Sequence, residues 1–571
     1  MIVIYNCHGI SNNLIKNFTN NKFSNFAIIG VLTLFLLIQI RFIYIGGTTY
    51  DADGLRFGSS IILEKVQRII SFNTDFNDLP FTNVEYYGMF VILPAYIFSH
   101  FFSSFINNPL DFGYYNIDGV IYLLMNLYLV VYVTVCLFFI SKKLQKLINF
   151  KTATLFLLLI ILTPSFSGHS LFNHKDIPYS LQLFLFAVYF VDYIKNSYED
   201  KIEKNSIYKL GILLGLTLGV RVNAIFFVSL LILIGIIYLI INKKLLIRQL
   251  AFDLLKIYLV GFILLYIISP SAWVNPGSWL VSAIQQQFLH NWSGSTLTNG
   301  EFVIALDMEW DYLIKWFFYK LPIIFHISIF LYIYLKYKDI KLDIITEFSA
   351  VFILSVFFVF ALIKPAVYDG LRQFLFLIPF FAIFSTDVYL KFIETNGIKG
   401  SYLIAPIFFY LIFTQYGLGS YRYVYFNEFV NLNNVSVECN NIDGCGTWPT
   451  DYWGYSGKEI AEYINKNILN GEIPEKSNFA WNGNYTSLLI CRPHIATSTY
   501  LDKGLNINKL NTGDYSRREF FTVTFHRPRF NDDSCKLLVN NIDYSCRPIY
   551  KLKKNLRFTE IDLAYINECK I

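Results

Sequence analysis

Two aspartates, Asp51 and Asp53, follow directly on the first long apolar stretch of the chain. Burial beside an apolar surface raises the pKa of a carboxylate and suits it to take a proton as a general base. A spacing of two residues also lets both carboxylates bind one divalent metal ion. Asp-x-Asp is a common string, so a solvated turn is the alternative. The position beside an apolar stretch favours Asp51 or Asp53 as a catalytic residue. The sequence does not decide whether a metal ion binds there.

A second polar cluster separates two later apolar stretches, and it reads Gly168-His169-Ser170-Leu171-Phe172-Asn173-His174-Lys175-Asp176-Ile177-Pro178. Ionisable side chains at a membrane edge are costly unless they pair or bind a ligand. A structural cap is the alternative, because Asp176 and Pro178 suit the start of the next helix. In the functional interpretation Lys175 binds an anion, while His169, His174 and Asp176 orient the bound group.

Arg221, in the string Arg221-Val222-Asn223, lies between two further apolar stretches. A snorkelling side chain is one interpretation. An anion clamp is the other, since the planar guanidinium group binds phosphate through two parallel hydrogen bonds.

The last cluster also joins two apolar stretches, and it reads Lys364-Pro365-Ala366-Val367-Tyr368-Asp369-Gly370-Leu371-Arg372-Gln373. Lys364 and Arg372 could share a phosphate. Asp369-Gly370 also matches a tight turn. Otherwise we expect Tyr368 and Asp369 to orient the bound group. Carboxylates in the first cluster and cations in the others describe a site for an anionic head group.

Membrane helices must position these clusters. Apolar residues make up 55% of the chain and charged residues only 15%, against about a quarter in soluble domains. The mean hydropathy is +0.45. We therefore predict an all-α polytopic membrane domain of about 11 transmembrane helices. The predicted spans are 25–45, 118–140, 152–168, 178–194, 209–220, 224–241, 251–270, 319–336, 346–364, 372–389 and 401–418. The pair 209–220 and 224–241 could instead be one kinked helix.

Basic residues indicate the orientation of these spans. They gather in alternate loops, at residues 142–151, 195–209, 243–248, 336–341 and 391–399. The positive-inside rule places these loops and the N-terminus in the cytoplasm, across a plasma or inner membrane. The net charge of +6 therefore reflects topology rather than nucleic-acid binding. Long segments then face outward at 46–117, 271–318 and 419–571, on the same side as all four polar clusters.

The first outward loop, 46–117, contains two segments that we predict to be helices in the membrane interface, at 55–70 and 86–102. A crossing at 86–102 would move the basic loop at 142–151 outside. The chain then divides into a transmembrane domain, 1–418, and a C-terminal extracytoplasmic α+β domain, 419–571.

The C-terminal segment contains six of the eight cysteines, which are Cys439, Cys445, Cys491, Cys535, Cys546 and Cys569. An even number outside the cytoplasm predicts up to three disulfides, and we expect at least two; free buried thiols are the alternative. The string Asp451-Tyr452-Trp453-Gly454 in this segment offers either a sugar-stacking surface or core packing.

The order of these features resembles the GT-C superfamily, and within it the protein O-mannosyltransferase and lipid A aminoarabinose transferase branch. Asp51 and Asp53 match its acidic position after the first helix, although the family usually has Asp-Glu there. The cluster at 168–178 resembles a subgroup pattern, with His174 in place of a proline. Three more strings resemble that subgroup: Tyr368-Asp369-Gly370-x-Arg372, Tyr425-Phe426-Asn427 and Asp451-Tyr452-Trp453-Gly454. The resemblance extends to about residue 465.

The resemblance implies a glycosyltransferase that moves a sugar, with inversion, from a polyprenyl-phosphate donor to a hydroxyl of a glycan, lipid or protein acceptor at the outward face. It implies that Asp51 deprotonates the acceptor hydroxyl or orients it, and that Lys175, Arg221 and Arg372 bind the phosphate. No cofactor is certain, and a divalent metal is compatible. The rival class is a transporter or flippase for a lipid-linked or anionic solute, which does not readily explain the long outward segments. A structural protein needs no clustered charges.

Overall fold

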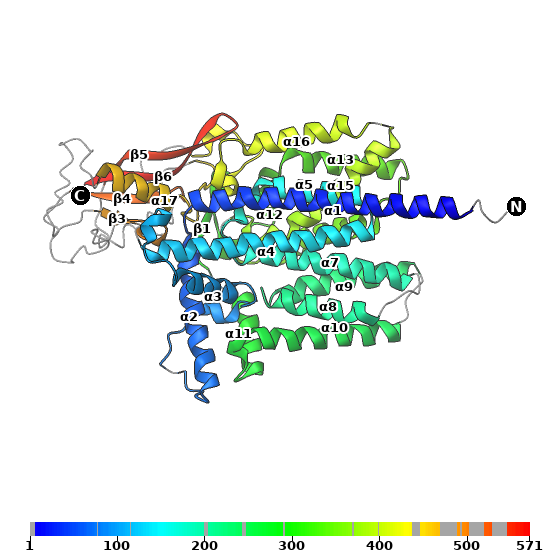
Figure 1. The fold of residues 1–571 in the computed structure, drawn as a ribbon. Coiled ribbons are helices and arrows are strands. Elements are labelled where there is room, and N and C mark those ends of the chain that lie inside the picture. The colour runs from blue at the N-terminus through cyan, green and yellow to red at the C-terminus, as the bar shows by residue number, and fades with distance from the viewer. Residues whose placement is uncertain are drawn as a thin grey trace.

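The computed structural model describes residues 6–570, except for residues 77, 115, 199–203, 243–246, 289–291, 368–369, 398, 437–445, 469–487, 491–493, 502–518 and 528–544. Its fold is a bundle of long, roughly parallel helices with a small sheet at one end (Figure 1). Each predicted span coincides largely with helix, although 152–168 is interrupted at Thr163 and 319–336 between Lys320 and Ile323. The bundle helices are α1 (Asn6–Ile45), α4 (Ile117–Leu147), α5 (Phe150–Leu162), α7 (Asp176–Tyr198), α8 (Lys204–Leu218), α9 (Ala224–Ile241), α10 (Ile247–Ile268), α13 (Ile323–Tyr337), α14 (Ile344–Ile363), α15 (Ile378–Thr395) and α16 (Ser401–Gln415).

The lengths of these helices show an integral membrane protein. In the described part of the chain, seven helices are long and apolar enough to cross a bilayer. Helix α12 (Tyr312–Lys320) and α13 make an eighth span if they are counted together, although they bend by 107° between them. Helices α5, α8 and α16 are apolar but shorter, so the count of about 11 remains a prediction. Helices α8 and α9 are separate and contact each other, so one kinked helix is the wrong interpretation.

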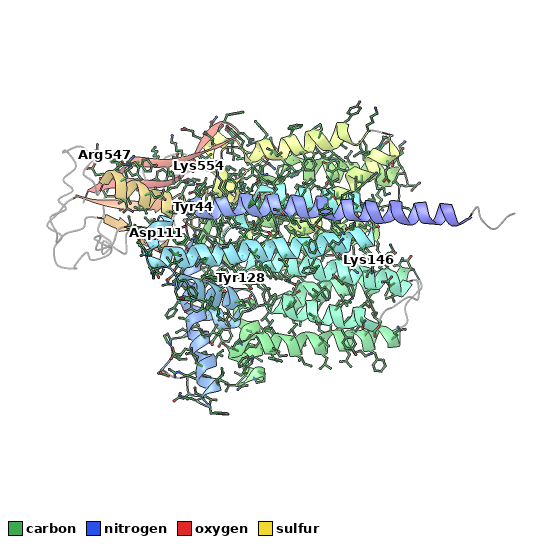
Figure 2. All side chains as sticks on the ribbon, in the orientation of Figure 1. Tyr44, Asp111, Tyr128, Lys146, Arg547 and Lys554 are labelled. Carbon is green, nitrogen blue, oxygen red and sulfur yellow. A yellow bond between two sulfur atoms is a disulfide. The ribbon has the colours of Figure 1, made fainter. Side chains whose placement is uncertain are left out.

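The three long segments between or after the spans gather at one end of the bundle. Helices α2 (Tyr50–Ile70), α3 (Ile92–Ser103) and α11 (Pro276–Phe288) lie there, together with the sheet (Figure 1). Figure 2 shows Asp111 and Arg547 at this end and Lys146, in the last turn of α4, toward the other. The orientation of these two ends across the membrane stays a prediction. We call the end with Asp111 and Arg547 the sheet end of the bundle.

Helices α2 and α3 correspond to the two predicted interfacial segments. Helix α2 runs across the direction of the bundle rather than along it (Figure 1). Its inner face buries Leu55 and Ile62, whereas Phe57 and Ile70 are exposed. Helix α2 begins at Tyr50, so Asp51 and Asp53 belong to its first turn and not to a solvated turn. Acidic residues there interact favourably with the helix dipole.

The C-terminal segment combines a four-stranded sheet with short helices, as the α+β prediction requires. The strand order is β3-β4-β6-β5, with β3 and β4 parallel and the other pairs antiparallel. The strands are β3 (Leu488–Ile490), β4 (Glu519–Phe525), β5 (Ser545–Leu556) and β6 (Thr559–Lys570), and the helices are α17 (Gly457–Tyr463) and α18 (His494–Ser498).

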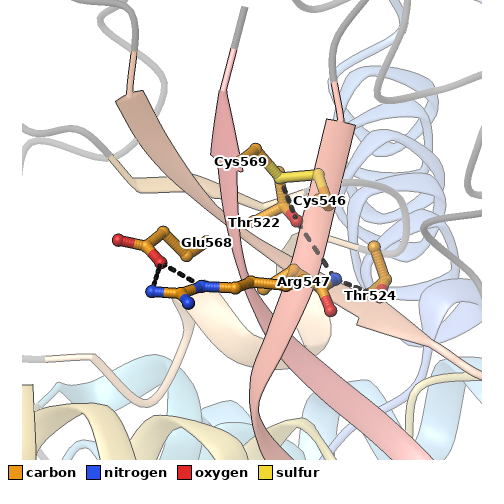
Figure 3. The surroundings of a disulfide bond; sticks show 7 residues. Thr522, Thr524, Cys546, Arg547, Glu568 and Cys569 are labelled. Atoms are coloured by element: carbon orange, nitrogen blue, oxygen red, sulfur yellow. Dashed lines mark hydrogen bonds and ion pairs between the residues drawn. A yellow bond between two sulfur atoms is a disulfide. The ribbon is translucent and has the colours of Figure 1, made fainter.

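One disulfide is present in the described part of this segment. Cys546 of β5 and Cys569 of β6 lie directly opposite each other and are bonded, beside Thr522 of β4 (Figure 3). The other cysteines of the segment, Cys439, Cys445, Cys491 and Cys535, lie outside the described residues. The expectation of a second disulfide therefore stays a prediction.

Candidate active site

Asp51 lies between two cations that come from distant parts of the chain. Its Oδ2 atom accepts a hydrogen bond from Lys175 Nζ at 2.9 Å and forms an ion pair with Arg372 Nη1 at 3.3 Å. Lys175 precedes α7, and Arg372 begins a short 3₁₀ helix, Arg372–Leu377, that leads into α15. The structure thus brings together three residues that the sequence analysis assigned to one site.

Arg221 and Asp176 form the second ion pair of the site. Arg221 lies in the turn between α8 and α9, and its guanidinium group donates to Asp176 Oδ1. Asn173 donates to the other carboxylate oxygen at 2.9 Å, while its own side-chain oxygen accepts from the Asp176 backbone N–H at 2.9 Å. Asp176 is therefore both part of a helix start and the counter-ion of Arg221, whereas its sequence neighbour Lys175 pairs with Asp51.

The turn that presents Arg221 is held by direct backbone contact with the first long loop. The Gly88 N–H donates to the Val220 carbonyl at 3.2 Å, and the Phe90 N–H donates to the Gly219 carbonyl at 3.0 Å. A Cβ atom at Gly88 would collide with the backbone of Gly219, so only glycine permits this approach.

All three predicted phosphate ligands line one cavity of about 330 Å³. Lys175, Arg221 and Arg372 contribute positive charge to its wall. Much of the remaining wall is apolar, with Phe226 and Phe227 from α9 and Val356, Val359, Phe360 and Ile363 from α14. Neutral polar side chains complete it, namely Tyr87, Tyr179, Asn223, Gln286, Gln287 and Gln373. A cavity with a cationic rim and an apolar wall fits an amphiphile with an anionic head.

The pKa of Asp51 does not follow the expectation from the sequence. Burial does act to raise the pKa of this carboxyl, but the charges of Lys175 and Arg372 outweigh it and hold the pKa well below its usual range. The expected raised pKa is therefore wrong for the site without a ligand. Asp51 is ionised at every physiological pH.

Asp53 points into a different cluster. Its Oδ1 atom accepts a hydrogen bond from the Tyr122 hydroxyl of α4 at 3.0 Å. Asp51 and Asp53 thus have separate hydrogen-bond partners. No group of three or more His, Cys, Asp or Glu that could hold a metal ion occurs in the described part of the chain.

The remaining predicted residues surround the cavity or lie away from it. His169 contacts the Tyr452 hydroxyl through Nε2 at 3.1 Å, and His174 contacts the carbonyls of Phe172 and Met125 through its two ring nitrogens at 2.9 and 3.1 Å. Neither histidine lines the cavity. Tyr368 and Asp369 lie outside the described residues.

Lys364, unlike the three cations above, does not line the cavity. It is exposed and ends α14 in a left-handed conformation. Its neighbours Ile363 and Pro365 do line the cavity, and a phosphate shared by Lys364 and Arg372 stays a prediction.

The C-terminal segment reaches the site, which the sequence analysis did not foresee. The Arg372 guanidinium carbon lies 4.5 Å from the ring centroid of Trp453, and the Trp453 carbonyl accepts from the Tyr50 N–H at 3.1 Å. Trp453 is only 2% exposed, so it is a packing residue and not a sugar-stacking surface. Arg527, buried after β4, also helps to lower the pKa of Asp51; no pattern in the sequence distinguishes it from other arginines.

The same segment fixes the connection between α1 and α2. The Gly47 N–H donates to the Tyr455 carbonyl at 3.2 Å, and a Cβ atom at Gly46 would collide with the buried Tyr455 ring. Lys458 Nζ donates to the carbonyl of Tyr44. The position of Asp51 is therefore set by residues 453–458 as much as by α1.

No family model matches the chain, and no curated protein matches it. Among solved structures, ArnT from Cupriavidus metallidurans bound to undecaprenyl phosphate matches with a TM-score of 0.48 and 10% identity, over 94% of this chain and 97% of that one. AglB from Archaeoglobus fulgidus, an archaeal oligosaccharyltransferase in complex with an inhibitory peptide and a dolichol-phosphate, matches with a TM-score of 0.45 and 12% identity, over 83% of this chain and 64% of that one. Both are members of the GT-C superfamily. These TM-scores are below 0.5, so the proposal of function rests on the geometry of the site.

Proposed function

We propose that this protein is an integral membrane glycosyltransferase that transfers a sugar from a polyprenyl-phosphate donor to an acceptor hydroxyl, at the extracytoplasmic face and with inversion. The observation that supports it most is the cavity, where Lys175, Arg221 and Arg372 meet an apolar wall of α9 and α14. A lipid phosphate needs both surfaces side by side. A soluble anion would need only the cations.

The proposed reaction forms one bond and breaks one. The acceptor oxygen attacks the anomeric carbon of the donor sugar, and the bond from that carbon to the phosphate oxygen breaks. The bond electrons leave with polyprenyl phosphate, whose growing negative charge is stabilised by Lys175, Arg221 and Arg372. The acceptor proton passes to Asp51.

Donor binding would itself prepare Asp51 for this role. Without a ligand, Asp51 occupies Lys175 and Arg372 as their counter-ion. A phosphate that engages the same cations would weaken both ion pairs, and the pKa of Asp51 would rise toward its ordinary value. The carboxylate would then be a stronger base when the donor is in place than when the site is empty.

A transfer assay tests this function. Purified full-length protein would be incubated with radiolabelled undecaprenyl-phosphate sugars and a panel of glycan, lipid and protein acceptors. We expect transfer of label to at least one acceptor, and its loss in Arg372→Ala. A protein that moves the lipid between leaflets of proteoliposomes and transfers no sugar would instead be a flippase, and the proposal would be wrong.

The proposed sidedness has its own test. The basic loops and the oxidised Cys546–Cys569 pair support an extracytoplasmic sheet end. A reporter fused after Ile571 that works only in the cytoplasm should give no signal. Strong cytoplasmic activity would reverse the orientation.

A further inference from the structure

The cavity contains more hydrogen-bonding groups than a phosphate can use. Among the described residues, three neutral side chains of its lining have a buried polar atom without a partner: Asn223 Oδ1, Gln287 Nε2 and Tyr179 Oη. They come from the α8–α9 turn, from α11 and from α7. A buried polar atom left without a partner is destabilising, so three around one cavity indicate a ligand that pairs with them.

The chemistry of these groups differs from that of the phosphate ligands. A phosphate diester can only accept hydrogen bonds, and Lys175, Arg221 and Arg372 already supply charged donors. A carboxamide or a phenol both donates and accepts. A sugar hydroxyl does the same, and no other part of a polyprenyl-phosphate sugar does.

We propose that Asn223 and Gln287, with Tyr179 beside them, form the subsite for the donor sugar and select a neutral hexose or pentose through its hydroxyls. This inference rests on the proposed function, since it assumes a lipid-phosphate sugar in the cavity. It makes these residues determinants of donor specificity.

The charges around the cavity favour a neutral sugar over an amino sugar. The described lining residues include three cations and no carboxylate. Among the described residues, the carboxylates that contact these cations, Asp51 and Asp176, are already paired with them. A positively charged amino sugar would therefore enter a positive field without a counter-ion of its own.

Binding measurements on full-length protein test the subsite with three probes: undecaprenyl phosphate, undecaprenyl-phosphate glucose, and the same lipid phosphate carrying a 4-amino pentose. Asn223→Leu and Gln287→Leu keep the size of the side chain and remove its hydrogen bonds. Each should lower affinity for the glucose-bearing lipid by about tenfold, the effect of one lost hydrogen bond, and leave undecaprenyl phosphate unchanged. Wild-type protein should prefer glucose to the amino sugar.

Matched variants separate recognition from folding. Gln285→Leu changes an exposed glutamine of the same helix and should alter no affinity. Gln287→Met and Asn223→Ser provide second substitutions if a leucine variant melts early. Glucose donors that each lack one hydroxyl provide a further test. Removal of the hydroxyl that binds Asn223 should lower the affinity of the wild-type protein but not that of Asn223→Leu.

Three results would overturn the inference. Equal losses for bare and sugar-bearing lipid would make the carboxamides phosphate or packing residues. Unchanged affinity for every probe in both variants would leave them without a role in the site. Preference for the amino sugar would reverse the predicted selectivity. If wild-type protein bound no lipid phosphate at all, the proposed function would be the part that fails.

Discussion

The carboxylate of Asp51 and the ammonium group of Lys175 are 124 residues apart in sequence and 2.9 Å apart in space. Arg372, which contacts the same carboxylate oxygen, comes from a third region of the chain. The resting site thus contains its own anion, at the place where the proposed phosphate binds.

The substitution Asp51→Asn should abolish most catalysis without weakening donor binding. It keeps the size and hydrogen bonding of the side chain but removes the base, so turnover should fall by about two to four orders of magnitude. Asp53→Asn is the matched control, because Asp53 contacts Tyr122 and not the cavity cations. Single-turnover transfer with labelled donor measures both. If Asp53→Asn were the more damaging of the two, the assignment of the base would move to Asp53.

Loss of either arginine should weaken donor binding. Arg372→Ala removes one charge-assisted contact to phosphate, which costs about 2 kcal/mol or roughly thirtyfold in affinity. Lysine should rescue only in part because it lacks the planar fork. Arg221→Ala also leaves the buried Asp176 without its cation. Its effect on donor binding should therefore be measured in the double variant Arg221→Ala/Asp176→Asn. Lys364→Ala serves as the control, and an affinity change there equal to that of Arg372→Ala would contradict the assignment.

The pH dependence of donor capture should show no acid limb from Asp51. Its folded pKa is lowered, so the stability from its ion pairs is fully present above the unfolded pKa of about 3.9 and is lost only as pH falls through the folded pKa. Between about pH 5 and 8, kcat/KM should therefore not decline through protonation of Asp51. A limb in this range that shifts in Asp51→Glu would show that the free carboxyl has a raised pKa.

Trp453 should act as a positioning residue for Arg372. Trp453→Leu removes the aromatic face under the guanidinium group and should weaken donor affinity by about tenfold, whereas Trp453→Phe should recover part of it. Trp448 is equally buried and packs on Trp316 instead, so Trp448→Leu controls for lost packing. Equal donor affinities in the two leucine variants would mean that Trp453 only fills space.

Removal of the Cys546–Cys569 disulfide should destabilise the sheet without touching the site. Changing both residues to serine should cost between about 2 and 4 kcal/mol, measured as a lower melting temperature of purified protein, with donor affinity unchanged at low temperature. Ser545→Ala, on the exposed side of β5, is the control. Mass spectrometry of unreduced peptides should show the bridged pair, and free thiols at both positions in native membranes would contradict it.

Hydropathy predicts the positions of the helices well, because a bilayer requires each span to be a long, predominantly apolar segment. The polar clusters between spans were equally visible, since ionisable residues such as Lys175 and Arg221 are costly there. The sequence does not indicate which charged residues form ion pairs. Lys175 is next to Asp176 in sequence, yet its ammonium group binds Asp51. The reason is that neighbouring side chains at a helix start point in different directions. The lowered pKa of Asp51 depends on that pairing, so burial alone predicts a pKa shift of the wrong sign.

The contribution of the C-terminal segment was the least predictable part of the site. The string around Trp453 predicts either a sugar-stacking surface or core packing, and nothing in the sequence indicates Arg527. Their importance comes from long-range packing, which no local pattern encodes. Gly46 and Gly88 illustrate the same limit, since each is glycine because a distant backbone or ring occupies the space that a Cβ would need.

The contact between Tyr455 and the α1–α2 connection constrains how the protein is made. Lys458 and Tyr44, which belong to this contact, are separated by 414 residues. Asp51 emerges early in synthesis, but its helix cannot be fixed in place until nearly the whole bundle has been inserted. A nascent or truncated chain without residues 453–458 therefore lacks the contacts that hold the start of α2, and with it Asp51, in place.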